Sequence, residues 1–188
     1  MPSLDAVTDD TFTERLRLSR AVASDLDEVF AIQSDPRVWT HYPSLRHTDR
    51  AQTVEMIERW ERSWADAGLG SWVARLRDTG EVVGNGGCTL LGGEVWNIGY
   101  RIAGDHHGQG LATELARAGV EAARSIAPER PVIAYLVEHN RASAHVAEKL
   151  GLELVHRAPD AGNPDPQVMR LVYADRPLTP EQLAATLK

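Results

Sequence analysis

The sequence predicts a mixed α/β (α+β) fold in which helices flank one central sheet of about seven strands, most of them antiparallel. Its 188 residues are 43% hydrophobic and 25% charged, the profile of one globular domain with enough chain for a substantial core. Strand-like segments joined by glycine turns between residues 71 and 102 indicate an antiparallel meander. A strand, a helix and a continuously apolar segment follow, which indicates one parallel pair joined by a right-handed crossover.

Alternating apolar residues and chain-breaking residues define the expected elements in the first half of the chain. Phe12 and Leu16 belong to an alternating pattern that indicates a strand. The Asp-Pro pair at 35–36 ends the helix that follows, and Gly68 is a natural C-terminal cap for a longer helix. Between these two helices, the aromatic segment 38–43 is either a hydrophobic plug or one wall of an acceptor pocket.

Helical spacing and one uninterrupted apolar run define the second half. Leu111, Leu115, Ala118 and Ala122 recur at helical spacing and mark a buried stripe. Residues 132–137, VIAYLV, form a run that is typical of a strand buried on both faces. The expected strands are residues 12–20, 71–77, 81–91, 97–102, 132–137, 152–158 and 168–174. The expected helices are residues 24–34, a longer one from 48 or 49 to about 67, 110–125, 142–150 and a short one from 179.

Composition and charge narrow the classes of protein. Without repeats or a linker, residues 1–188 are expected to form one domain, with 1–10 as a loose lead-in and 177–188 as a C-terminal tail. The net charge of −7 without a basic patch excludes a nucleic-acid footprint, and the single Cys88 excludes an intramolecular disulfide. The N-terminal segment lacks the apolar region of a signal peptide and no apolar run reaches membrane-spanning length, so we expect a cytoplasmic location.

The segment from Trp96 to Thr113 has the pattern of a strand, a short glycine-bearing loop and the start of a helix. First-turn amides of a helix lack intrahelical partners and carry the positive end of its dipole. Gly108 and Gly110 let an anion approach that backbone, which is the chemistry of a phosphate cradle. No lysine follows as in a Walker A loop, and Thr113 stands where a Rossmann fingerprint starting at Gly108 needs its third glycine. From these residues alone, a tight turn without a ligand is the alternative.

Two segments resemble the signatures of the GNAT N-acetyltransferases. Residues 105–112 resemble the acyl-CoA pyrophosphate loop, usually written Arg/Gln-x-x-Gly-x-Gly/Ala, with Asp105 at the Arg/Gln position. Residues 140–152 are similar to the second signature, N-x-x-S-x-x-V-x-E-K-x-G-F, in the form typical of the branch with the RimJ/RimL-type ribosomal-protein acetyltransferases. The two lie in the expected order and about the expected distance apart. The resemblance covers roughly residues 13–174 in layout, and its sharp motifs lie in the second half.

The resemblance implies a GNAT fold, in which the strand before the phosphate loop and the strand after its helix splay apart and acyl-CoA enters the gap. Acetyl-CoA is then the co-substrate, and its acetyl group passes to a primary amine by direct attack in a ternary complex. The amine belongs either to a protein N-terminus or to a small molecule. The implied acetyl-CoA contacts are Ile98, Tyr100, Arg101, Ile102, His107, Gly108, Gln109, Gly110, Leu111, Ala112, Thr113, Asn140 and Ser143.

Three residues are candidates for preparing the amine. In many relatives a glutamate occupies the position of Asn97, and an amide cannot act as a base, although it can orient a water. Glu94, three residues earlier, and His41, in the aromatic segment, are the substitutes. Each has a simpler interpretation, Glu94 as a solvated turn carboxylate and His41 as a partly buried loop histidine. The departure at Asn97 also motivates an alternative function, a non-catalytic acyl-CoA-binding or regulatory protein on the same scaffold.

The candidate acid is Ser143, at the serine position of the Rim-type signature. Its hydroxyl is expected to donate a hydrogen bond to the sulfur of the leaving thiolate. Many GNAT enzymes use a tyrosine just before the Glu-Lys pair, and Ala147 stands there instead. Asn140 and Ser143 also suit simple helix capping, because both residue types favour that position.

Metal and partner expectations follow from the same residues. None of the seven histidines has a recognised ligand spacing and there is no cysteine cluster, so no metal site is expected. The expected partners are acetyl-CoA and an amine acceptor, with no nucleic acid and no membrane, in a monomer or a homodimer.

Overall fold

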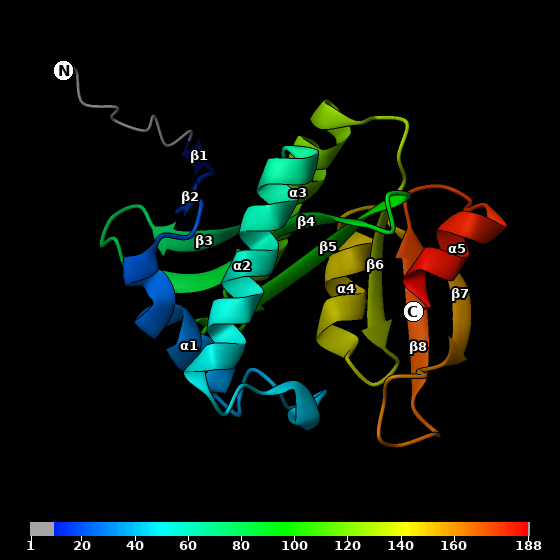
Figure 1. Ribbon diagram of the computed structural model, residues 1–188, viewed down its shortest axis with the longest axis horizontal. Coiled ribbons are helices and arrows are strands. Elements are labelled where there is room, and N and C mark those ends of the chain that lie inside the picture. The colour runs from blue at the N-terminus through cyan, green and yellow to red at the C-terminus, as the bar shows by residue number, and fades with distance from the viewer. Residues whose placement is uncertain (1–9, 188) are drawn as a thin grey trace.

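A computed structural model describes residues 10–187, which form one twisted eight-stranded sheet with helices on both faces (Figure 1). The strand order is β1-β2-β3-β4-β5-β6-β8-β7, and β5–β6 is the one parallel pair among the described strands. The predicted fold class is therefore confirmed. The strands are β1 (Thr11–Phe12), β2 (Leu16–Ser19), β3 (Ser71–Leu76), β4 (Val82–Leu91), β5 (Val95–Ile102), β6 (Val132–Val137), β7 (Glu153–Pro159) and β8 (Met169–Ala174).

The eighth strand arises where one continuous strand was expected. The backbone turns between Phe12 and Leu16, so that β1 and β2 pair as a short antiparallel hairpin with Thr11 opposite Leu18. Thr13 holds this turn, since its hydroxyl accepts from the Leu16 nitrogen at 3.0 Å and its own nitrogen donates to the Leu16 carbonyl at 2.9 Å. The expected lead-in, except for residue 10, lies outside the described residues.

Helices cover both faces of the sheet, with α2 in front of α3 in Figure 1. On one face, Val29 of α1 and Trp60 of α2 belong to a buried cluster with Val73 of β3. On the other, Leu115 of α3 and Val146 of α4 belong to the main core. The helices are α1 (Leu26–Ser34), α2 (Arg50–Ala67), α3 (Leu111–Ile126), α4 (Arg141–Lys149) and α5 (Pro180–Thr186). Within the described residues, none is both long and apolar enough to cross a bilayer.

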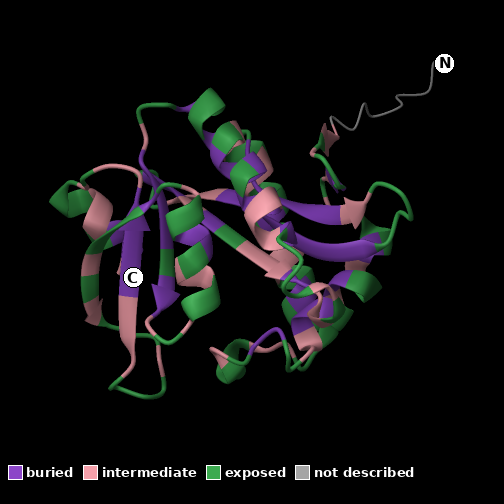
Figure 2. Ribbon diagram, turned by 180° about the vertical axis from the view of Figure 1, so that it is seen from behind, coloured by how far each residue is buried: buried purple, intermediate pink, exposed green. Residues whose placement is uncertain are grey.

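The core follows the middle strands, where Figure 2 shows the buried residues gathered. The predicted stripe of α3 is confirmed, because Leu111, Leu115 and Ala118 are buried, while Ala122 is partly buried. The apolar run of β6 is also buried apart from Tyr135, which is 41% exposed and lines the gap described next.

The parallel strands β5 and β6 separate soon after they meet. They pair only through Trp96 with Val132 and Asn97 with Ile133, and the Trp96 nitrogen donates to the Pro131 carbonyl at 2.9 Å. Beyond Ile133, β6 keeps only its antiparallel pairing with β8, which runs along its other edge. Backbone groups of alternate residues point to the same side of a strand. The amides and carbonyls of residues 98, 100 and 102 therefore face an open gap.

Candidate active site

Two adjoining cavities occupy this gap. One, of about 280 Å³, lies between β5, β6 and α4, and the other, of about 270 Å³, continues to the glycine loop before α3. Both are lined by His41, Tyr100, Arg101, Asn140 and Ser143. Together they make a trough that runs from the glycine loop into the space where β5 and β6 part.

The glycine loop presents unpaired amides to one end of the trough. The first intrahelical hydrogen bond of α3 runs from the Glu114 nitrogen to the Gly110 carbonyl at 3.1 Å, so the three amides before it have no intrahelical partner. Gly108 and Gly110 have φ of 77° and 80°, a region that favours glycine. A Cβ at Gly108 would meet no atom within 4 Å, so backbone conformation rather than crowding selects glycine there. This geometry suits an anion at the start of α3.

Two arginines from distant parts of the chain support the loop, and sequence reasoning missed both. Arg15 of the β1–β2 turn donates to the Gln109 carbonyl at 2.8 Å and pairs with Glu114. Arg37 pairs with Asp105 at 2.6 Å and lowers the pKa of that carboxyl, which stands at the Arg/Gln position of the loop signature. No local motif marks these arginines, because they lie 94 and 68 residues from their loop partners.

The free edge of β5 is covered in part by side chains. Arg101 Nη1 donates to the Tyr100 carbonyl at 2.7 Å, and His107 Nε2 lies 2.9 Å from the Ile102 carbonyl. Both carbonyls face the gap. A ligand that pairs with this edge would replace these two contacts.

Ser143 lines both cavities of the trough and belongs to the first turn of α4. The Asn140 side chain accepts from the Ser143 backbone nitrogen at 3.2 Å, which confirms that Asn140 caps the helix. Tyr100 adjoins Ser143, and burial raises the pKa of its phenol against smaller opposing effects of the Ser143 hydroxyl and Arg101. Tyr100 thus brings a second hydroxyl to the gap, which its place in the alternating strand could have signalled. Ala147 is buried.

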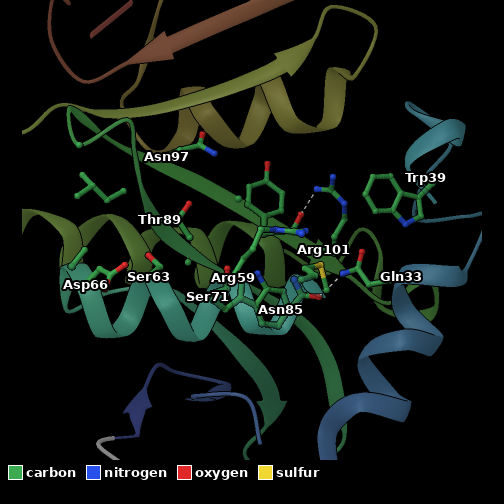
Figure 3. A pocket seen from close by; sticks show the side chains of 18 residues that line it. Gln33, Trp39, Arg59, Ser63, Asp66, Ser71, Asn85, Thr89, Asn97 and Arg101 are labelled. Carbon is green, nitrogen blue, oxygen red and sulfur yellow. Dashed lines mark hydrogen bonds between the residues drawn. The ribbon is translucent and has the colours of Figure 1, made fainter. Parts of the chain in front are cut away.

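A larger cavity, of about 540 Å³, lies on the opposite face of β5, beneath α2 (Figure 3). It shares Asn97, Gly99, Tyr100 and Arg101 with the gap. The two faces of the sheet are therefore open to ligands at the same stretch of β5. The other polar side chains that line it include Gln33, Arg59, Ser63, Asp66, Ser71, Asn85 and Thr89.

The structure brings three of the four catalytic candidates together. Asn97 lines both the gap and the α2-side cavity, and its Oδ1 is buried without a hydrogen-bond partner. Ser143 and His41 line the gap. Burial, with smaller contributions from Arg101 and another histidine, lowers the pKa of His41 to about 4. Glu94 is exposed in the β4–β5 turn and lines neither cavity, which agrees with its simpler interpretation as a solvated carboxylate.

The aromatic segment 38–43 lies close to both the cluster under α2 and the gap. Trp39 is buried in the cluster under α1 and α2, as a hydrophobic plug would be, while its neighbour His41 lines the gap. Trp39 therefore fits the plug interpretation and also lines the α2-side cavity, while a role of the segment as a wall of an acceptor pocket stays a prediction. Across residues 10–187, no three histidine, cysteine or acidic side chains are grouped so that they could hold a metal ion.

Known proteins are similar to this chain in sequence and in architecture. A family model described as an acetyltransferase (GNAT) domain matches residues 15–153. YkkB of Bacillus subtilis is 33% identical over 146 residues, which cover 74% of this chain and 83% of that protein. An acetyltransferase from Agrobacterium tumefaciens has a TM-score of 0.72 at 26% identity, covering 94% of this chain and 99% of that one.

The ribosomal alpha-N-protein acetyltransferase RimL, solved in complex with coenzyme A, shares the fold. Its TM-score is 0.73 at 17% identity, covering 87% of this chain and 95% of that one. The family model spans most of the described chain, including both signatures and the strands that part at the gap. The chain belongs to the GNAT acetyltransferase family.

Proposed function

We propose that this chain transfers an acetyl group from acetyl-CoA to a primary amine by direct attack in a ternary complex. The proposal depends on one observation: the trough and the α2-side cavity meet at β5. The trough approaches residues 97–101 from the α3–α4 face, and the larger cavity approaches them from the α2 face. Two substrates can thus reach one point from opposite sides of the sheet, and such positioning supplies a large part of the rate.

The residues present fit acetyl-CoA. The amides of Leu111, Ala112 and Thr113 would hold the pyrophosphate, with Gly108 and Gly110 allowing close approach. The free edge of β5 would bond the pantetheine amides in place of the covering Arg101 and His107 side chains. RimL was solved with coenzyme A, and this likeness of fold supports the same site here. When bound, acetyl-CoA supplies an activated thioester.

Chemistry at the gap needs a hydrogen-bond donor for the sulfur and a neutral amine. We assign the first to Ser143, which lines both cavities of the trough. We assign to Asn97 the positioning of the amine, or of a water that takes its proton, because its unpaired Oδ1 is an acceptor. His41 would be a weak base because its pKa is so low, and the exposed Glu94 would have to act through solvent.

The finer classification rests on the second signature. We also propose that the chain is one domain over residues 1–188 that acts in the cytoplasm as a monomer or a homodimer. Within the family, we place it in the RimJ/RimL-type branch. The support is the Asn140 and Ser143 pair at the start of α4, with Ala147 in place of the tyrosine that other GNAT enzymes use. The branch leaves the acceptor open.

A non-catalytic acyl-CoA-binding protein is the competing function. Asn97 in place of glutamate and Ala147 in place of tyrosine favour it. Against it, the α2-side cavity is large and lined with polar groups, which a protein that binds only acyl-CoA does not need.

Calorimetric titration with acetyl-CoA, followed by a free-thiol assay against peptides and small amines, separates these functions. Binding with thiol release on one class of amine would support the enzyme. Binding without release on any amine would favour the regulatory protein. No binding would contradict the acetyl-CoA site on which both depend.

A further inference from the structure

The α2-side cavity has an open floor between two polar side chains of β5. Asn97, Gly99 and Arg101 alternate along the strand and so share one face, and a Cβ on Gly99 would meet no atom within 4 Å. Asn97 and Arg101 are four positions apart, which places their Cα atoms about 13 Å from each other along an extended strand. Figure 3 shows Arg101 with Trp39 and Gln33 toward one end of the pocket and Asn97 toward the other.

Arg101 brings a positive charge to this floor without a counter-ion. Its Nη1 donates to the Tyr100 carbonyl, its guanidinium lies 4.2 Å from the Trp39 ring centroid, and its Nε is buried without a hydrogen-bond partner. Among residues 10–187, no carboxylate forms an ion pair with it. Burial lowers its pKa, and an unpaired charge away from water is costly.

Two other inward-facing arginines of this chain are neutralised by buried carboxylates. Arg75, whose side chain is 12% exposed, pairs with Asp25, and Arg170, also 12% exposed, pairs with Asp160 at 2.6 Å. Both carboxylates are themselves buried. Arg75 and Arg170 thus each have a carboxylate partner. Arg101 has none within the described residues and lines a cavity instead.

Unpaired polar atoms are concentrated in the same cavity. Four of the seven buried side-chain nitrogen and oxygen atoms that lack a partner in the described chain belong to its lining. Two are donors, Trp39 Nε1 and Arg101 Nε, and two are acceptors, Gln33 Oε1 and Asn97 Oδ1. Donors suit a carboxylate and amide oxygens suit an amine. The Asn97 acceptor is also the one that borders the gap.

We propose that the acceptor is a small amino acid whose carboxylate binds Arg101 while its amine faces Asn97. This inference rests on the proposed acetyl transfer. A guanidinium binds a carboxylate with two parallel hydrogen bonds, which also fixes the orientation of the ligand. A protein N-terminus continues as an amide and has no carboxylate next to its amine. The cavity of about 540 Å³ is within the range of small-molecule sites. The acceptor therefore belongs to the small-molecule class.

Matched acceptors test this assignment in a thiol-release assay with acetyl-CoA. The probes are α-, β- and γ-amino acids, each paired with its carboxamide, together with short peptides. Replacing the carboxylate by an amide is expected to lower kcat/KM roughly 10- to 100-fold, as for the loss of a charge-assisted hydrogen bond. In Arg101→Gln, an amino acid and its amide should be turned over with similar kcat/KM. Calorimetry should still detect acetyl-CoA binding by this variant, because the first-turn amides of α3 that are proposed to hold the pyrophosphate are unchanged.

Arg62→Gln is the matched control. Arg62 belongs to the same helix α2 but is exposed and does not line the α2-side cavity, so this variant removes an equal charge without removing the proposed contact. It should keep the preference for the acid. If Arg101→Gln fails to fold, Arg101→Lys retains the charge without the bidentate fork, and it should show a reduced but measurable preference.

The other possible outcomes contradict either the amino-acid acceptor, the role of Arg101 or the acetyl transfer itself. Equal turnover of acids and amides by the wild type, or release with peptides alone, would overturn the amino-acid assignment and leave the acetyltransferase intact. Weaker acetyl-CoA binding by Arg101→Gln with the preference retained would assign Arg101 to the co-substrate. No release with any amine would overturn the proposed reaction, and this assignment with it.

Discussion

The side-chain oxygen of Asn140 accepts a hydrogen bond from the backbone nitrogen of Ser143 at 3.2 Å, and this contact begins α4 beside the trough. The cap orients the first turn of the helix so that Ser143 lines the gap. One contact therefore serves both the helix and the proposed site. Helix capping and a role for Asn140 at the site are compatible.

Ser143→Ala should slow acyl transfer while leaving acetyl-CoA binding nearly intact. The expected loss in the acyl-transfer rate is roughly 100-fold, since the leaving sulfur loses its proposed hydrogen-bond donor. Single-turnover thiol release measures the step, and calorimetry measures binding. Ser24→Ala, at an exposed position before α1, is the control and should behave as the wild type. An unchanged transfer rate in Ser143→Ala would remove Ser143 from the mechanism.

Gly110→Glu should abolish binding of acetyl-CoA. The change places a negative charge at the start of α3, where the pyrophosphate is proposed to lie. Gly110→Asn is the control, because asparagine tolerates the left-handed backbone found at Gly110 and adds no charge. It should weaken binding far less. If Gly110→Glu is folded by circular dichroism and binds acetyl-CoA normally, the pyrophosphate lies elsewhere.

Asp25→Asn should destabilise the fold by about 3 kcal/mol. Asp25 is 3% exposed, pairs with Arg75, whose side chain is 12% exposed, and accepts from the Val22 nitrogen at 2.9 Å. Removing its charge leaves an uncompensated arginine in the interior. Urea unfolding measures the change. Asp27→Asn, which breaks the exposed pair with Arg50, should cost less than about 1 kcal/mol, and equal losses would contradict the difference in burial.

His41 should titrate near pH 4 in the folded protein. Burial is the largest cause of its low pKa and the charge of Arg101 is the next, so Arg101→Gln should raise that pKa. NMR of the imidazole measures both values. A His41 pKa close to 6.5, or one that Arg101→Gln does not raise, would contradict the placement of the two side chains.

The same shift predicts how stability depends on pH. The unfolded chain binds a proton at His41 near pH 6.5, whereas the folded protein does so only near pH 4. This residue therefore contributes a fall in the free energy of unfolding as pH drops from about 6.5 to about 4. His41→Asn should show a shallower fall over that window in denaturant titrations. The same slope in both proteins would exclude His41 as a contributor.

Local sequence pattern was enough to predict the elements that depend on residues close to one another in the chain. The glycines at 108 and 110 adopt the positive φ that a tight turn into α3 requires. Leu111 and Leu115, four positions apart, follow the period of a helix and correctly predicted the buried face of α3. The β1–β2 hairpin escaped prediction because its turn depends on hydrogen bonds of Thr13, which alternation of apolar residues does not reveal. Tyr135 is exposed because β5 and β6 part beside it.

The sequence by itself determined the fold class, the glycine loop at the start of α3 and the cap at the start of α4, because helix periods, turn conformations and capping residues act over a few neighbouring residues. Only the tertiary structure decided which charges surround the site. Arg15 meets the Gln109 carbonyl across 94 residues, and Arg101 is left without a carboxylate because none of the strands and helices packed around it supplies one from within the described chain. The chemistry of the acceptor cavity therefore depends on long-range packing, which no local pattern records.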